Sequence, residues 1–530
     1  MSTYDYIIVG GGTAGCILAN RLSASGQHQV LVLEAGGEPK GFWLPIPAGF
    51  SKLLVDRRFN WRFQTAPEAN TDQRVIAVPR GKGLGGSTLI NGMIYVRGQP
   101  GDYDAWEQAG AKGWNYQNLA PYFRQFEAYA QGGPERGQHG PMQVHQVSER
   151  YPVASAFLQA AEQAGQPRNH DYNGQAQEGF GYYQVFQKAG RRWSAYDGYL
   201  KPARQRANLA VITGAQVLAL ELAGTRCTGL RYRQGGQLHS ATARREVILC
   251  AGAIQSPQLL ELSGIGRADV LRAAGIAQRH RLDGVGENYI DHFATRMNWR
   301  LNNTLTLNQM ARGWRLGLAV AEYFSRRTGI LTLGTGLVHG FVKTQPAMAS
   351  PDVQYFFVHA SYANAAERIL DRHPGMTIGV SQLRPTSRGS IHIQSADPEQ
   401  MPAIKPNFLA DEQDRRSLIG GMRMARDIVN QPALRDYLEA ETSPGAETLS
   451  DEQWLAYARA NGQTIYHPIG TCRMGEGPLA VVDAELRVHG LAGLRVVDAS
   501  VIPSMVSGNI QGAVMAVAER AAVLILQGVG

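Results

Sequence analysis

The clearest change of hydrophobic pattern lies in the first 34 residues. Residues 4–9 (YDYIIV) form a short apolar run, which is typical of a buried strand. Residues 17–22 (ILANRL) place their apolar side chains at helical spacing, and residues 29–33 (QVLVL) form a second apolar run. The pattern therefore predicts a strand, a helix and a second strand in direct succession.

Strand and helix patterns recur later in the chain. Strand patterns are found at 208–222, 242–252, 353–360 and 389–395. Helical spacing is found at 411–429 and 451–461. We expect the segments after residue 296 to form a mostly antiparallel sheet with helices behind it. With the N-terminal unit, this predicts an α/β protein that is α+β overall.

Residues 312–327 (RGWRLGLAVAEYFSRR) predict a helix with arginines at both ends and Trp314, Leu318 and Phe324 between them. Such a helix either packs on the protein with a solvated basic face or lies on a membrane surface. Both interpretations stay open. The longest apolar stretches, such as 521–526, are far shorter than the ~20 residues that cross a bilayer.

Composition narrows the class of protein. The 530 residues are 44% apolar and 18% charged, as in a compact enzyme with more than one substructure. The net charge of +8 is spread along the chain without a dense basic stripe, so we expect no nucleic-acid partner. The four cysteines are scattered and no secretory signal opens the chain, so we expect a cytoplasmic protein without structural zinc.

The turn after the first strand carries the strongest motif. Gly10, Gly12 and Gly15 form G-x-G-x-x-G, and the second strand ends in an acidic residue. Glycines let a pyrophosphate approach a helix N-terminus, and the acid binds a ribose hydroxyl. NAD and FAD share the ADP half that this motif binds, so the motif alone leaves the choice open. The expected contacts are Gly10, Gly12, Thr13, Ala14, Gly15, Glu34 and Ala35.

A second glycine cluster lies at 80–92 (RGKGLGGSTLING). It offers more backbone freedom than an NAD site needs, and a loop without side chains can lie flat against a large planar group. The alternative on composition alone is a mobile surface loop. The cluster therefore favours a flavin without establishing it.

His467 stands on constrained backbone in TIYHPIGTCRMG at 464–475. A lone histidine of this kind is most often simply buried. A zinc site would need further ligands, and only Cys472 lies near it in sequence, so we expect no metal. A thiol–imidazole pair would need an acyl substrate that nothing else indicates. Proton transfer remains, because an imidazole accepts protons near neutral pH.

Five segments together resemble the glucose–methanol–choline (GMC) flavin oxidoreductases. They are 80–92, 252–266 (GAIQSPQLLELSGIG), 464–475, 494–504 (LRVVDASVIPS) and 507–509 (SGN). The resemblance runs from about residue 4 to residue 526 and is strongest to the choline and alcohol dehydrogenase branch. It implies a Rossmann-like FAD domain assembled from 1–150, 196–295 and 461–530. It also implies a substrate domain formed by 151–195 and 296–460.

The resemblance also implies the roles of site residues. His467 occupies the position of the family's catalytic histidine, and Asn509 occupies the second catalytic position. Members that link FAD covalently carry a histidine where this chain has Ile90, so we expect non-covalent FAD. Further expected FAD contacts are Gly83, Gly86, Ser87, Asn91, Gly92, Met93, Val217, Ala251, Asp498, Ala499, Asn509 and Ile510.

The expected reaction is oxidation of a primary alcohol to an aldehyde. Choline-specific relatives place a carboxylate at a strand position that falls here on Leu337, so an uncharged aliphatic or aromatic alcohol is favoured over choline. Leu337, His339 and Tyr466 are the expected pocket residues, with Leu337 and His339 on one strand face. A quinone, a protein carrier or oxygen would accept the electrons, and a peripheral membrane contact would suit a quinone. Choline oxidation and a hydroxynitrile lyase that retains FAD without redox use are the alternatives.

Overall fold

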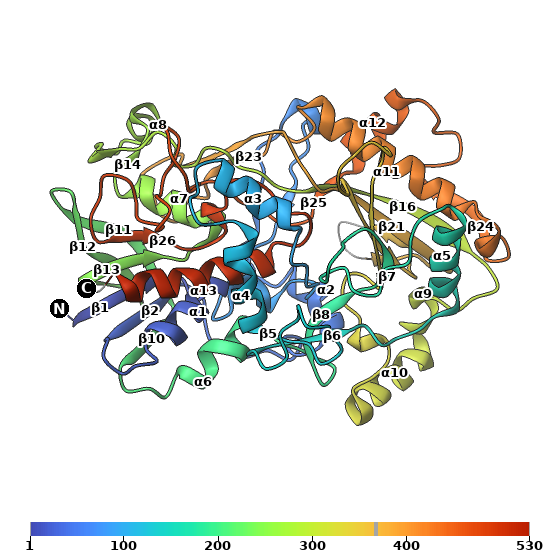
Figure 1. Ribbon diagram of the computed structural model, residues 1–530, viewed down its shortest axis with the longest axis horizontal. Coiled ribbons are helices and arrows are strands. Elements are labelled where there is room, and N and C mark those ends of the chain that lie inside the picture. The colour runs from blue at the N-terminus through green and yellow to red at the C-terminus, as the bar shows by residue number, and fades with distance from the viewer. Residues whose placement is uncertain (1, 365–368, 529–530) are drawn as a thin grey trace.

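A computed structural model describes residues 2–364 and 369–528 of the chain. Two large sheets lie in opposite halves of the molecule (Figure 1). The first half contains both termini, and the second half contains α11 (Glu412–Val429) and α12 (Asp451–Asn461). These two helices match the ranges that helical spacing predicts to within one residue.

The first sheet is seven-stranded, and its core strands are parallel. β1 lies between β2 and β13, with β10 beyond β2 and β26 beside β13, all in parallel pairs. β11 and β12 extend it in antiparallel pairs. The strands are β1 (Ser2–Val9), β2 (Val30–Glu34), β10 (Leu209–Thr213), β11 (Ala215–Ala223), β12 (Arg226–Gln234), β13 (Gln237–Leu249) and β26 (Leu494–Val496).

Helices cover this sheet because its strands are apolar on both faces. All five residues of β2 are buried. α1 (Thr13–Leu22) follows β1 directly and packs against α13 (Gln511–Gln527), which in turn packs on α4 (Tyr116–Phe126). α7 (Gly252–Leu262) packs against β11. Buried parallel strands between helices are typical of nucleotide-binding α/β sheets, as the N-terminal pattern predicts.

The second sheet is also seven-stranded and is antiparallel throughout its described pairs. Helices α11, α12 and α5 (Pro152–Gln163) pack behind it, which confirms the predicted fold class. Its strands are β24 (Leu438–Ser443), β16 (Phe293–Leu301), β21 (Gly375–Gln382), β18 (Val353–Val358), β17 (Val338–Val342), β7 (Gly179–Tyr182) and β25 (Gln463–Thr464).

One predicted strand belongs elsewhere. β22 (Ser390–His392) pairs only with β23 (Ala403–Lys405) among the described strands, outside the second sheet. Its central residue Ile391 is buried with Ile404 and with Ile254 of α7. The alternation at 389–395 identified a strand correctly, but its apolar side packs on the first half of the molecule because α7 offers the apolar partner.

Smaller elements connect these parts. The remaining described α-helices are α2 (Phe50–Leu53), α3 (Pro100–Gln108), α6 (Lys201–Ala203), α8 (Ala268–Ala273), α9 (Leu307–Met310) and α10 (Gly313–Arg326). The remaining two-stranded pairs are β3 (Phe63–Gln64) with β4 (Ala77–Val78), β14 (Ile265–Gly266) with β15 (His280–Arg281), and β19 (Tyr362–Asn364) with β20 (Ile369–Leu370). Among the helices within 2–364 and 369–528, none is both long and apolar enough to cross a bilayer.

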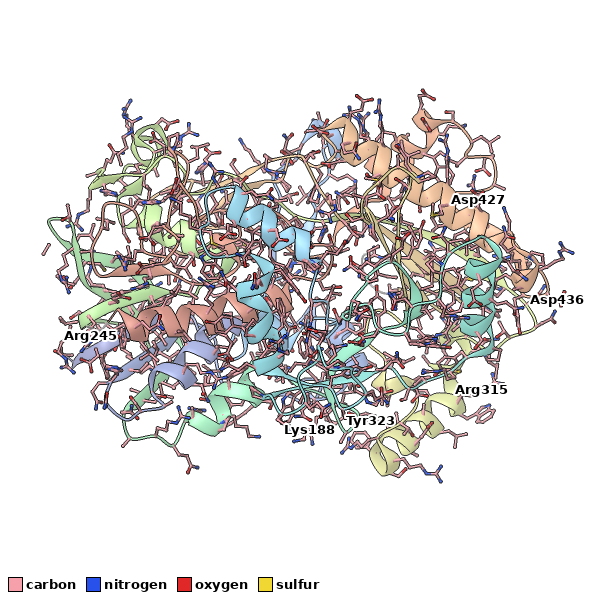
Figure 2. The ribbon with its side chains drawn as sticks, viewed as in Figure 1. Lys188, Arg245, Arg315, Tyr323, Asp427 and Asp436 are labelled. Atoms are coloured by element: carbon pink, nitrogen blue, oxygen red, sulfur yellow. The ribbon has the colours of Figure 1, made fainter. Side chains whose placement is uncertain are left out.

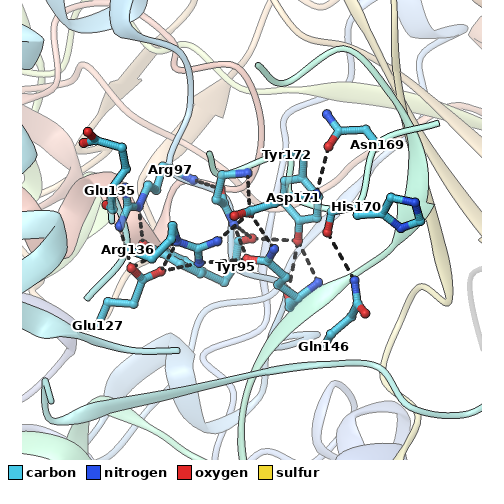
Figure 3. A network of polar contacts seen from close by, with 12 residues as sticks. Tyr95, Arg97, Glu127, Glu135, Arg136, Gln146, Asn169, His170, Asp171 and Tyr172 are labelled. Carbon is cyan, nitrogen blue, oxygen red and sulfur yellow. Dashed lines mark hydrogen bonds and ion pairs between the residues drawn. The ribbon is translucent and has the colours of Figure 1, made fainter. Parts of the chain in front are cut away.

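A four-stranded sheet joins segments on either side of the predicted boundary at residue 150. It contains β5 (Glu127–Ala128), β6 (Met142–Gln146), β8 (Gln184–Lys188) and β9 (Arg191–Arg192). At its edge Glu127, which is fully buried, binds the guanidinium groups of Arg97 and Arg136 (Figure 3). Arg136 also pairs with Asp171. Buried ions need such partners because desolvating a lone charge costs several kcal/mol.

Replacing Glu127 by glutamine should destabilise the protein strongly. The amide keeps the shape but removes the negative charge, which leaves Arg97 and Arg136 buried without their shared partner. We expect the free energy of unfolding to fall by about 3–5 kcal/mol. Glu135→Gln is the matched control, because Glu135 pairs with Arg124 at 3.5 Å on the exposed surface. Equal urea midpoints for the two FAD-loaded variants would contradict this role.

Candidate active site

A cavity of about 330 Å³ lies between the two sheets. One wall contains the residues at the carboxyl ends of β1, β2, β13 and β26. The opposite wall contains Arg296 of β16, Phe356 of β18 and Gly379 of β21. Ligands of open parallel sheets bind outside the carboxyl ends of the strands, so this cavity is the expected place for a dinucleotide.

The turn between β1 and α1 forms the cavity floor. Gly10 has φ +100°, and a Cβ there would lie 2.5 Å from the carbonyl oxygen of Cys250. Gly12 is the N-cap of α1 and lines the cavity with Thr13 and Ala14, so the helix begins at the cavity with free backbone N–H groups. Gly15 does not line the cavity; a Cβ there would lie 1.9 Å from the carbonyl oxygen of Gly10, so this glycine packs α1 onto β1.

Glu34 ends β2 at the cavity, beside Ala35. Its carboxylate accepts hydrogen bonds from three backbone N–H groups, at Gly11 (2.8 Å), Gly36 (2.7 Å) and Gly83 (3.0 Å). Gly83 does not line the cavity; its N–H group holds the carboxylate of Glu34 in place. Oε1 accepts two of these bonds and Oε2 accepts one, so Oε2 keeps a lone pair that suits a ribose hydroxyl.

The second glycine cluster lies against the first. Gly86 has φ +53°, and a Cβ there would lie 2.7 Å from Cα of Gly12, so the two backbones touch. From this loop Ser87, Asn91, Gly92 and Met93 line the cavity. Arg192 donates to the amide oxygen of Asn91 at 2.8 Å and fixes its orientation. The loop is thus ordered by contacts with the rest of the site and is not a free surface loop.

The remaining expected FAD contacts come from segments far apart in sequence. Those that line the cavity are Val217, Ala251, Asp498, Ala499, Asn509 and Ile510. Asp498 accepts hydrogen bonds from the backbone N–H groups of Gly252 and Ser500, both at 2.8 Å. Burial raises the pKa of this carboxyl above its ordinary value. Asp498 therefore joins the start of α7 to η7 (Ala499–Val501) at the cavity edge.

These residues fit FAD. The contact between Gly12 and Gly86 leaves no room for a Cβ, so backbone alone faces the cavity there. A helix start suits a pyrophosphate, and Glu34 suits the adenosine ribose. The cavity continues past this half to Asn91, Ile90 and His467, which leaves a further compartment for a flavin ring.

His467 and Asn509 meet at the far end of the cavity, and both line it. The amide nitrogen of Asn509 lies 3.1 Å from Nε2 of His467. Asn509 follows a loop that leads into α13, whereas His467 follows β25, so the two arrive from different elements. The pKa of His467 is held well below its usual value by burial, and further lowered by His292 and Arg80.

Sequence reasoning missed Asp291 and His292. Asp291 is buried and accepts the backbone N–H of His467 at 2.8 Å and the hydroxyl of Tyr289 at 3.0 Å. Burial raises its pKa to about 6. Nδ1 of His292 lies 3.0 Å from Nδ1 of His467. The available signal was an adjacent Asp–His pair directly before a buried strand, in GENYIDH at 286–292.

The three expected pocket residues are placed differently. Tyr466 lines the cavity beside His467. Leu337 and His339 are buried but do not line it. His339 pairs with Phe356 across β17 and β18, so it is on the cavity side of the sheet, but the rings of Tyr172 and Tyr183 pack against it. The position predicted to face the substrate is therefore one strand away from the cavity.

Sequence comparisons agree with this geometry. The N-terminal model of the GMC oxidoreductases matches residues 4–294, and the C-terminal model matches residues 385–518. An oxygen-dependent choline dehydrogenase of Photobacterium profundum is 40% identical over 99% of this chain and 93% of its own. An alcohol dehydrogenase [acceptor] of Pseudomonas putida is 38% identical over 99% of this chain and 96% of its own.

Solved structures show the same fold. A pyridoxine 4-oxidase from Mesorbium loti superposes with a TM-score of 0.89 at 31% identity, covering 98% of both chains. A formate oxidase superposes with a TM-score of 0.92 at 27% identity, covering 100% of this chain and 99% of its own. The two family models together span most of the sequence, including the first wall of the cavity and both His467 and Asn509. The chain belongs to the GMC oxidoreductase family.

Proposed function

We propose that the protein oxidises an uncharged primary alcohol to an aldehyde, with non-covalently bound FAD. FAD supplies the acceptor for the hydride that leaves the alcohol carbon. The observation that carries the proposal is the imidazole of His467, which faces the cavity with the Asn509 amide 3.1 Å from its Nε2. Family membership makes the chain an FAD-dependent oxidoreductase of CH–OH donors.

His467 is suited to take the hydroxyl proton. Burial and the nearby Arg80 hold its pKa well below the usual value, so the imidazole is neutral at neutral pH and can accept a proton. The Asn509 amide can donate a hydrogen bond to the substrate oxygen as negative charge develops there. Asp291 holds the backbone of His467, which fixes the distance between the imidazole and the cavity.

Charge at the cavity favours an uncharged substrate. Among the described residues that line the cavity, the only carboxylates are Glu34 and Asp498, and both lie in the dinucleotide half. The other end contains the guanidinium groups of Arg80 and Arg296. A quaternary ammonium would lose its hydration there and gain no anionic partner from the residues that the structure describes. Trp61, Phe356 and Tyr466 instead offer apolar contacts to an aliphatic or aromatic tail.

Two alternative reactions would use the same residues. Choline oxidation is supported by the names of the curated relatives, including the one from Photobacterium profundum. A hydroxynitrile lyase would use His467 without oxidising its substrate. Anaerobic addition of substrate separates the lyase from the oxidoreductase, because only the oxidoreductase bleaches a yellow flavin.

The electron acceptor we propose is a quinone or a protein carrier, with oxygen as the alternative. α10 supports a quinone in a membrane because its apolar side faces solvent. Ala319 and Tyr323 are buried, whereas Trp314 (71% exposed) and Leu318 (61% exposed) are not. Figure 2 labels Tyr323 on this helix. Five large apolar residues of α10 are exposed: Trp314, Leu316, Leu318, Val320 and Phe324.

The surroundings of α10 fit a bilayer with anionic lipids. The ring of Phe42, 64% exposed, stacks on Phe324 at 6.2 Å and extends the apolar surface beyond the helix. Arg312 and Arg327 flank the helix, and Arg315 and Arg326 lie along its polar edge. Aromatic and aliphatic side chains in the acyl boundary, with arginines at the phosphates, are typical of helices that lie on membranes.

The first test concerns the catalytic pair. His467→Ala should lower anaerobic flavin bleaching by roughly 10²–10⁴-fold while FAD stays bound, because the variant lacks the proton acceptor. Asn509→Ala should cost about 3 kcal/mol of transition-state stabilisation. Stopped-flow absorbance across a panel of alcohols measures both. Near-normal bleaching in FAD-loaded His467→Ala would refute the assignment.

Acid precipitation of the wild type should release all its yellow colour, because we propose that the FAD is not covalently bound.

The second test separates charge from shape in the substrate. 3,3-Dimethyl-1-butanol has the shape of choline without its charge. We expect kcat/KM for this alcohol and for benzylic or medium-chain alcohols to exceed that for choline at least tenfold, because the described residues at that end of the cavity offer cations and no carboxylate. A tenfold preference for choline over its uncharged analogue would overturn the substrate proposal but not the alcohol oxidation itself.

The third test concerns the α10 surface. The protein should float with vesicles of phosphatidylcholine and phosphatidylglycerol and bind pure phosphatidylcholine more weakly. Trp314→Ser combined with Leu318→Ser should reduce flotation at least tenfold, since each buried apolar side chain contributes about 1.5–3 kcal/mol. Leu238→Ser is the control, because Leu238 is 71% exposed on β13. Flotation unchanged by the double substitution, or a dimer that it dissociates, would contradict the membrane contact.

A further inference from the structure

His292 lies directly behind His467, and the ring of His292 makes two polar contacts, one with Leu383 and one with His467. It is fully buried, immediately before β16. Its Nε2 lies 3.0 Å from the carbonyl oxygen of Leu383, and its Nδ1 lies 3.0 Å from Nδ1 of His467. The two rings are nearly perpendicular, at 81°. Both nitrogens of His292 therefore have a defined partner.

The partners determine where each proton lies. A carbonyl oxygen only accepts hydrogen bonds, so Nε2 of His292 must carry a proton. Burial lowers the pKa of His292 to about 4, so the ring is neutral and its Nδ1 carries a lone pair. Nδ1 of His467 must then donate to it. The opposite assignment would leave the Nε2 lone pair of His292 facing the Leu383 carbonyl at 3.0 Å.

The same reasoning determines the protonation state of Nε2 of His467, the ring nitrogen that faces the cavity. With its proton on Nδ1, neutral His467 has a lone pair on Nε2, where the Asn509 amide donates at 3.1 Å. The amide of Asn509 is itself oriented, because its oxygen accepts from Nε2 of Gln354 at 3.3 Å. The hydrogen bonds thus run in one direction, from Gln354 through Asn509, His467 and His292 to Leu383. Donors and acceptors alternate along the whole chain.

We propose that His292 is a positioning residue that holds His467 in the tautomer whose Nε2 lone pair faces the cavity. This rests on the proposed alcohol oxidation, in which Nε2 takes the hydroxyl proton. When it does, Nδ1 keeps its own proton, and the bond to His292 becomes charge-assisted. His292 therefore both selects the tautomer and stabilises the imidazolium, as partners behind functional histidines do.

Other charged groups near the pair would remain unchanged in a His292 variant. Arg80 disfavours the protonated form of His467, and Asp291 accepts the backbone N–H of His467. The hydroxyl groups of Tyr289 and Thr464 donate to the other carboxylate oxygen of Asp291. A change in the titration of His467 on replacing His292 would therefore report the lost hydrogen bond between the rings.

A direct test reads the tautomer without turnover. In FAD-loaded protein with ring-¹⁵N histidine, the His467 resonances, assigned by their loss in His467→Gln, should show a protonated Nδ1 and a bare Nε2 at pH 7. A protonated Nε2 would overturn the proposal. This result does not depend on alcohol oxidation, so a protein with the expected tautomer and no activity on alcohols would count against the proposed function alone.

Kinetic measurements test the effect of His292 on turnover and on the titration of His467. His292→Leu removes the acceptor, and kcat should fall roughly 10–100-fold at unchanged FAD content. Above about pH 4 His292 is neutral and its hydrogen bond favours the imidazolium of His467; only a protonated His292 would repel that imidazolium. Loss of the bond therefore lowers the pKa of His467 further, so the acidic limb of the kcat profile should move to lower pH. His292→Asn keeps an acceptor oxygen and should recover most of the rate. An unmoved limb, or equal losses in both variants, would assign His292 a structural role only. If His292→Leu does not fold, the asparagine variant and the wild-type resonances decide.

Discussion

Direct backbone contact between three segments is the constraint on which the site depends. Gly10 lies against the carbonyl of Cys250, and Gly12 lies against Gly86, with no space for a Cβ at Gly10 or Gly86. A methyl group at either position would push the segments apart and open the floor of the cavity. Because side chains are excluded, the floor presents N–H groups and a helix start, a surface that suits a phosphate group. Glu34 depends on the same contact, since Gly83 reaches its carboxylate only while the loops touch.

The two walls of the cavity then perform different tasks. The first wall presents mainly backbone groups, which suit a dinucleotide; the second, formed by β16, β18 and β21, presents side chains, which we propose select the substrate. Residues 91–97 connect the cavity to the buried ion cluster. Asn91 and Met93 line the cavity, and a few residues later Arg97 enters the buried ion cluster with Glu127. The position of the cavity loop is thus tied to a charged cluster whose members tolerate little displacement.

Local features of the site were readable from the sequence, and long-range ones were not. The turn at Gly10 and the acid at Glu34 belong to one short unit whose geometry follows from its own residues. Strand alternation placed His339 on the correct face of the sheet. It could not give the strand order, so it did not show that Tyr172 and Tyr183 cover that position. His292 lies 175 residues from its partner, and only the folded chain reveals that contact.

The order of the strands in the first sheet has a consequence for the synthesis of the protein. β1 is made first, yet β26 joins the sheet only after residue 494, and α13, which packs on α1, ends at Gln527. At about 5–20 residues per second, the ribosome needs roughly half a minute to two minutes to reach α13. Throughout this time the side of α1 that α13 covers lacks its partner. The first half of the molecule is therefore completed only at the end of translation, and this apolar surface stays exposed for longer than in a protein whose domains are contiguous in sequence.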